Sequence, residues 1–93
     1  MPTNLHQIIR YRTINHCLLR KQSIRWNWEE LSVACGDALR ENIRSDMPDP
    51  SQRTIKGDII IMRSGKLGYE APIVYDRSKE SYQYTDPSFS ITN

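Results

Sequence analysis

The chain has 93 residues, a length that allows one small domain with a single core and excludes two independent cores. Its 38% hydrophobic and 26% charged residues are typical of a folded globular domain and exclude a disordered chain. The net charge of +2 neither demands nor excludes a polyanionic partner, so the distribution of charge has to decide. No stretch of about eighteen apolar residues is present, and the N-terminus lacks a signal peptide, so we expect a cytoplasmic protein with no membrane contact.

The first predicted helix runs from about Leu5 to Arg20, because Asn4 followed three residues later by Gln7 has the form of a capping box. Its apolar residues fall on two nearly opposite faces, one with Tyr11, Ile14, Cys17 and Leu18 and the other with Leu5, Ile8 and Ile9. One small core cannot cover both faces. Either the first turns are not helical, or the patch of Leu5, Ile8 and Ile9 docks on a second copy of the chain or on another domain.

The second predicted helix follows a polar connection over residues 20–25 and has Asn27 as its cap. Its apolar residues recur at helical spacing and form the strongest amphipathic pattern of the chain: Leu31, Ala34, Cys35, Ala38 and Leu39. Trp28 lies on the same face, which favours a place in the core over a role as a ligand platform. Gly36 inside this helix indicates the close approach of another backbone.

The third predicted helix covers residues 52–64, between the cap Ser51 and the left-handed stop Gly65. The segments 71–75 and 81–84 are short and rich in β-formers, and the polar residues 76–80 between them predict a hairpin with a charged tip. Pro72 requires an edge position or the start of a strand. The predicted fold is therefore α+β, a winged helix with a three-helix helix-turn-helix bundle followed by a two-stranded wing. It would occupy residues 1–87, and residues 88–93 would be a linker or tail.

Sites for catalysis or metals are not indicated by the sequence. Cys17 and Cys35 are single and widely spaced among apolar residues, which predicts two reduced, buried thiols. His16 and Cys17 lack the repeated short spacing of a zinc site, and no catalytic triad, carboxylate pair or glycine-rich phosphate loop is found. We therefore expect no enzymatic activity, no cofactor and no small-molecule ligand for these residues.

The outward face of the third helix has the chemistry of a DNA-recognition surface. Opposite the inward row of Ile55, Ile59 and Met62, the helical wheel places an outward set, with Gln52 and Lys56 on the flank nearer the helix start. This outward set is Arg53, Gly57, Ile60 and Ser64. Amide and guanidinium groups suit base edges, an ammonium group suits phosphate, and a glycine permits close approach to a groove. Cations on a helix face are also common as solvated surface, so charge alone leaves both interpretations open.

Several motifs resemble the N-terminal helix-turn-helix of WYL-domain transcriptional regulators, in the form common in Bacteroides-like bacteria. The central one is Ser51-Gln-Arg53-Thr54-Ile55 with Asp58-Ile59, and it is followed by the sequences at 62–69 and 71–76. Segments 9–18, 28–39 and 84–91 are similar as well, so that the likeness covers nearly the entire chain. Such regulators continue into a WYL domain that is held to sense an effector and to assemble dimers. The resemblance thus implies that this chain is the DNA-binding piece alone.

The resemblance implies that the third helix lies in the major groove of double-stranded DNA and that the hairpin is the wing. By position in the motif, it implies DNA contact for Arg53 and Thr54. Asp58 also matches a motif residue, and its place at the edge of the inward row predicts a structural role, such as pairing with a neighbouring arginine. The predicted DNA-binding set is Ser51, Gln52, Arg53, Thr54, Lys56, Gly57, Lys66, Arg77 and Lys79. The alternative function is a winged-helix interaction or dimerisation module without DNA binding, which would use the patch of Leu5, Ile8 and Ile9.

Overall fold

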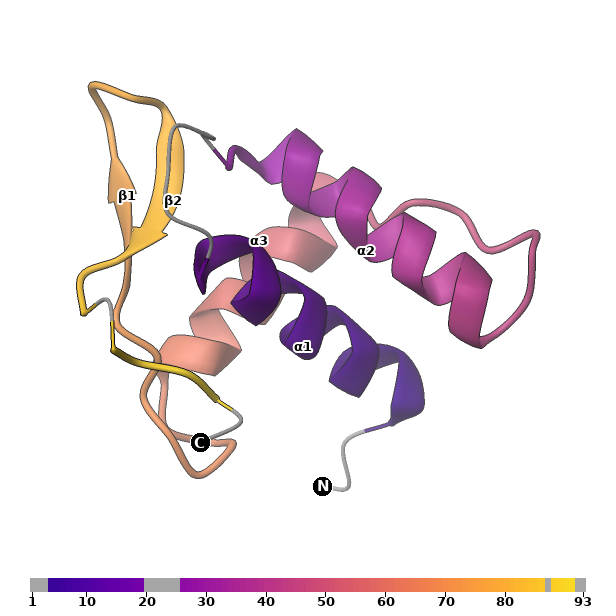
Figure 1. Ribbon diagram of the computed structural model, residues 1–93, viewed down its shortest axis with the longest axis horizontal. Coiled ribbons are helices and arrows are strands. Elements are labelled where there is room, and N and C mark those ends of the chain that lie inside the picture. Colours follow the sequence, from indigo (N-terminus) through magenta and orange to yellow (C-terminus); the bar gives the residue numbers. More distant parts are fainter. Residues whose placement is uncertain (1–3, 20–25, 87, 92–93) are drawn as a thin grey trace.

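The computed structural model describes residues 4–19, 26–86 and 88–91. Three helices, α1 (Leu5–Leu19), α2 (Trp28–Asn42) and α3 (Gln52–Arg63), precede a hairpin of β1 (Ile73–Asp76) and β2 (Ser81–Tyr84). Figure 1 shows the hairpin along one side of the packed helices. The predicted winged helix is thereby confirmed. The connection predicted over residues 20–25 lies outside the described residues.

Local capping interactions fix where the helices begin and end. The side chain of Asn27 accepts a hydrogen bond from the Glu30 amide, and that of Ser51 accepts one from the Thr54 amide. Asn4 and Gln7 exchange the two bonds of a capping box at the start of α1. After α3, Gly65 adopts φ +85°, the left-handed conformation predicted for a helix stop.

The first turns of α1 are helical, so the alternative that they are not is wrong. The buried face of the helix contains Tyr11, Ile14, Asn15, Cys17 and Leu18. On the other face, Leu5 keeps 58% of its surface exposed, while Ile8 and Ile9 are half-buried. Ile8 lines a mostly apolar groove together with Tyr11, Arg12, Leu67, Tyr69 and Ile91. The patch predicted for α1 is therefore exposed chiefly at Leu5.

The core joins all three helices and the first strand. Its largest fully buried apolar side chains are Ile14, Leu31, Ile55, Met62 and Ile73. Both cysteines are buried in this core and neither forms a disulfide within the described residues, as expected from their apolar surroundings. The Cys35 thiol donates a hydrogen bond of 3.8 Å to the carbonyl oxygen of Arg10, and burial raises its pKa to about 12.

The hairpin is antiparallel, with Ile73 opposite Tyr84 and Tyr75 opposite Tyr82. The first strand starts two residues later than predicted. Pro72 has no amide proton to donate to the neighbouring strand, and the Ile73 amide donates a hydrogen bond of 2.8 Å to the Ala71 carbonyl. On the other side of β2, the Tyr82 amide donates to the Trp26 carbonyl at 2.8 Å, which ties the start of the second helix to the wing.

Two further contacts differ from what the sequence suggests. The neighbour of Gly36 is not a backbone: an added Cβ would meet the Asp49 carboxylate, with Oδ1 at 1.7 Å, so the prediction of close backbone packing is wrong. The segment 88–91 folds back against α1. Asn15 donates to the Ser90 hydroxyl and accepts from the Ile91 amide, at 3.3 and 3.4 Å, and the Phe89 ring packs edge-on against Tyr84.

Candidate nucleic-acid interface

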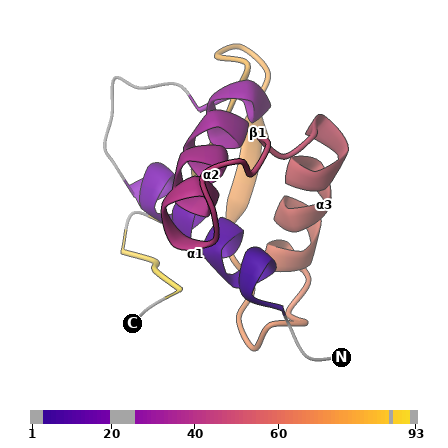
Figure 2. The same ribbon diagram turned by 90° about the vertical axis from the view of Figure 1, so that its right-hand side faces the viewer.

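The outward face of α3 is exposed along its whole length. Gln52, Arg53 and Lys56 are exposed in the first two turns, and Ile60 and Arg63 continue the same surface toward the C-terminal end. Figure 2 shows α3 at one edge of the molecule, with its N-terminal end and the hairpin tip toward the same end. A partner can therefore reach the helix and the tip together.

Gly57 lies in the middle of this face. A Cβ built on it meets nothing within 4 Å, so the glycine leaves an open notch between Arg53 and Ile60. No packing requirement of the fold explains a glycine at this position, where alanine would favour the helix by about 0.5–1 kcal/mol.

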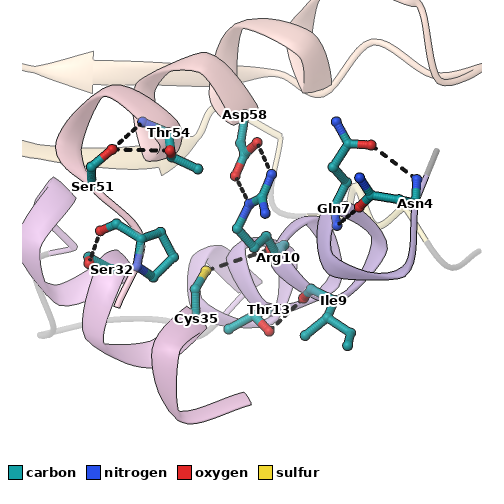
Figure 3. A network of polar contacts seen from close by, with 11 residues as sticks. Asn4, Gln7, Ile9, Arg10, Thr13, Ser32, Cys35, Ser51, Thr54 and Asp58 are labelled. Carbon is teal, nitrogen blue, oxygen red and sulfur yellow. Dashed lines mark hydrogen bonds and ion pairs between the residues drawn. The ribbon is translucent and has the colours of Figure 1, made fainter. Parts of the chain in front are cut away.

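The single carboxylate of α3 is withdrawn from the outward face. Asp58 points inward and accepts two hydrogen bonds from the Arg10 guanidinium of α1, at 2.6 and 3.1 Å (Figure 3). Their side chains are 5% and 14% exposed. Burial raises the pKa of Asp58, and the hydrogen bond and charge of Arg10 offset only part of this rise. The pairing of Asp58 with an arginine, predicted from its place at the edge of the inward row, is confirmed.

Charge is consequently partitioned over the surface even though the net charge is only +2. Since Asp58 is buried, the outward face of α3 carries positive charges alone, from Arg53, Lys56 and Arg63. The exposed face of α2 carries the opposite charge, from Glu29, Glu30, Asp37 and Glu41. The outward face of α3 and the exposed face of α2 therefore carry opposite charge.

The hairpin tip is held by one side chain. The Asp76 carboxylate accepts hydrogen bonds from the amides of Ser78 and Lys79 and from the Ser78 hydroxyl, at 2.7 to 3.2 Å. The hydrogen bond from Ser78 lowers the pKa of Asp76. Glu80 completes the turn with φ 51°, and Arg77 and Lys79 are exposed on it.

A cavity of about 400 Å³ lies between α3 and the hairpin. Its walls combine side chains from the starts of α2 and α3 with the paired tyrosines of the wing, whose rings lie 5.0 Å apart: Asn27, Trp28, Gln52, Lys56, Tyr75 and Tyr82. Trp28, half-buried, thus packs against the core as predicted and also lines this cavity. Cationic, amide and phenol groups at one crevice are the types that bind phosphate and sugar oxygens.

Comparison with known families decides the identity of this fold. Residues 6–85 match the family described as the N-terminal winged helix domain of WYL domain-containing proteins. The chain belongs to this family. Searches of curated proteins and of solved structures gave no significant match.

Within this WYL winged helix domain, the residues predicted to bind DNA fall into three groups. Gln52, Arg53, Lys56 and Gly57 share the outward surface of α3. Ser51 and Thr54 are engaged in the cap, where their hydroxyl oxygens lie 3.1 Å apart. The remaining cations are exposed at two ends of the surface, Lys66 beyond the C-terminus of α3, and Arg77 and Lys79 on the hairpin tip.

Sequence reasoning missed the contribution of aromatic residues to this surface of the WYL winged helix domain. Nothing in the local sequence brings Tyr75 and Tyr82 beside Lys56, because their proximity depends on how the hairpin packs on the helices. Arg63 could have been predicted from the sequence, because the helical wheel places it on the same flank of α3 as Gln52 and Lys56. In the described part of the chain, no helix is long and apolar enough to cross a membrane, and no three His, Cys, Asp or Glu residues cluster as metal ligands would.

Proposed function

We propose that this WYL winged helix domain binds double-stranded DNA as part of a bacterial transcriptional regulator. In this proposal α3 lies in the major groove and the hairpin tip contacts the backbone. The observation that carries it is the outward face of α3, whose charged side chains are all cationic because the Asp58 carboxylate is buried in its ion pair with Arg10. Membership of the family of WYL winged helix domains also supports the proposed DNA binding.

The proposed division of labour follows from side-chain chemistry. Arg53 and Gln52, on the first turn, reach base edges, since guanidinium and amide groups pair bidentately with guanine and adenine. Lys56 lines the crevice between α3 and the wing and neutralises a phosphate. Arg77 and Lys79 hold the next stretch of backbone, and the Asp76 bonds keep their turn in place.

Fluorescence anisotropy on a labelled random duplex at two salt concentrations tests this function. We expect binding that weakens steeply with salt, and Lys56→Ala should lower the salt slope by about one unit if Lys56 meets a phosphate. Arg53→Ala should cost about 1 to 3 kcal/mol on a selected sequence. Arg44→Ala is the matched control, because Arg44 is an exposed cation outside α3 and the hairpin. Failure to bind any duplex at low salt would refute the proposal.

Leu5 favours a second candidate function, an interaction module that pairs with another copy of the chain. Its side chain is 58% exposed at the start of α1, close in sequence to Ile8 in the apolar groove of about 260 Å³. Sedimentation at increasing concentration should then show a dimer that Leu5→Glu abolishes. A monomer at all concentrations would exclude self-association through this patch.

The wider setting of the domain is also part of the proposal. We expect a WYL domain beyond residues 88–93 in the complete regulator, action in the cytoplasm, and an origin in Bacteroides-like bacteria, as the sequence resemblance implies. Mass spectrometry of the native protein from its source cells would test the first of these expectations, because a mass near 10.9 kDa would exclude a second domain.

A further inference from the structure

We infer that Ile60 reads a pyrimidine 5-methyl group in the major groove, an inference that rests on the proposed DNA binding. Ile60 lies on the outward face of α3 with 63% of its surface exposed, more than any other large apolar side chain of the described residues. The other apolar side chains of the helix point inward or sideways: Ile55, Ile59 and Met62 are buried and Ile61 is half-buried. Ile60 is thus an apolar group in the middle of a cationic surface.

The surroundings of Ile60 identify the chemistry of its partner. Arg53, Gly57 and Ile60 follow one another at positions i, i+4 and i+7 and so form one stripe along the helix. A partner held by Arg53 and Lys56 is polyanionic, and the open notch at Gly57 lets it come close to the helix axis. The apolar group that a DNA duplex offers in its major groove is the C5-methyl of thymine. The same methyl group is carried by 5-methylcytosine.

The stripe also gives a spacing. Seven residues at about 1.5 Å each place Ile60 about 10 Å along the axis from Arg53. Base pairs follow one another at about 3.4 Å along the DNA axis, so the methyl group should lie no more than about three base pairs from the base that Arg53 contacts, and fewer where the helix follows the inclined groove. Only one methylated position per binding site should depend on Ile60.

Uracil scanning tests this inference. The full chain first selects its sequence from a random duplex library, and each thymine of that sequence is then replaced singly by uracil, which removes only the methyl group. We expect one replacement to raise the Kd about fourfold, the effect of exposing about one methyl group. In Ile60→Ala that replacement should have no effect, while penalties at other positions persist. Because Ile60 is exposed, this variant should fold, and its thermal melting checks that it does.

A matched control and a second arm complete the design. Val33→Ala removes an apolar side chain that is 51% exposed on α2, and it should leave the uracil profile unchanged. Where the selected sequence has cytosine at the critical position, 5-methylcytosine should tighten binding about fourfold in the natural protein and not in Ile60→Ala. If Ile60→Ala showed the same effects of uracil and of 5-methylcytosine as the natural protein, the inference would be overturned, while the proposal of DNA binding would stand. Absence of any selected sequence and of any duplex binding would overturn both.

Discussion

Replacing Arg10 by glutamine should destabilise the domain far more than the loss of a surface ion pair would. The change removes the cation and both guanidinium hydrogen bonds from Asp58, whose side chain is only 5% exposed. Breaking a buried pair by removing one partner costs about 3 to 5 kcal/mol. We expect about 3 kcal/mol, because Arg10 is 14% exposed and glutamine keeps one donor in reach. For a domain of 93 residues, with about 5 to 14 kcal/mol in total, this lowers the melting temperature by roughly 12 to 24 °C.

The stability lost by Arg10→Gln relative to the natural domain should decrease as the pH falls. Burial already raises the pKa of Asp58 in the natural domain, and removing Arg10 removes the interactions that lower it. In the variant, the folded state therefore takes up a proton at a higher pH than the unfolded chain does. Protonation of Asp58 then contributes stability that is fully present below the unfolded pKa of about 3.9 and lost as the pH rises through the folded pKa. The difference in unfolding free energy between the two proteins should narrow from pH 7 toward pH 4.

Urea denaturation followed by circular dichroism at pH 7 and pH 4.5 measures both effects. The matched control is Arg44→Gln, since Arg44 and Asp46 form an ion pair of 2.7 Å with side chains 64% and 77% exposed. That variant should lose less than about 0.5 kcal/mol. A loss below about 1 kcal/mol for Arg10→Gln at pH 7, or a deficit that stays constant or grows on acidification, would refute the reasoning.

Three further predictions concern single positions. Gly57→Ala should raise the unfolding free energy by about 0.5–1 kcal/mol, measured by urea denaturation, yet weaken duplex binding in anisotropy because it fills the notch. A variant that is stabilised with unchanged DNA affinity would remove the argument for close approach. Tyr84→Phe should cost about 1 kcal/mol, because the phenol donates a bond of 2.7 Å to the Asn15 side chain; equal melting temperatures would contradict this role. Cys35, with its pKa raised to about 12, should resist alkylation at pH 8 until the domain unfolds, and rapid labelling of the native protein would show the thiol to be accessible.

The helices were predictable from sequence because their limits depend on local chemistry. Asn27 and Ser51 cap amides three residues ahead, and Gly65 supplies a conformation that other residues rarely adopt. Each of these residues lies within a few positions of the helix end that it determines. The inward row of α3 was predictable for the same reason, since helical periodicity is a local property.

Contacts between distant segments were not predictable in this way. The bridge from Trp26 to Tyr82 joins residues far apart in the chain, and no spacing pattern encodes it. Asp49 fills the space beside Gly36 only because the loop before α3 folds back on α2. A sequence pattern showed that Gly36 has a close neighbour without showing which group it is.

The candidate interface also combines features that the local sequence predicts with features that depend on tertiary packing. The chemistry of α3 could be read from the sequence, because Arg53 and Lys56 lie on the helical face opposite the core row. The partner of Asp58 could only be expected to be an arginine, and its identity as Arg10 depends on the packing of α1 on α3. The crevice between Lys56 and Tyr75 depends on the placement of the wing.

We propose that the outward face of α3 and the hairpin tip form one DNA-binding surface. Titration of the 15N-labelled chain with a short duplex, followed by amide chemical shifts in NMR spectra, tests it most directly. We expect the largest shifts at Gln52, Arg53, Lys56 and Gly57 and in the tip at residues 77–79, with the exposed face of α2 unchanged. Shifts concentrated on α2 or at the start of α1, or no shifts at low salt, would contradict it.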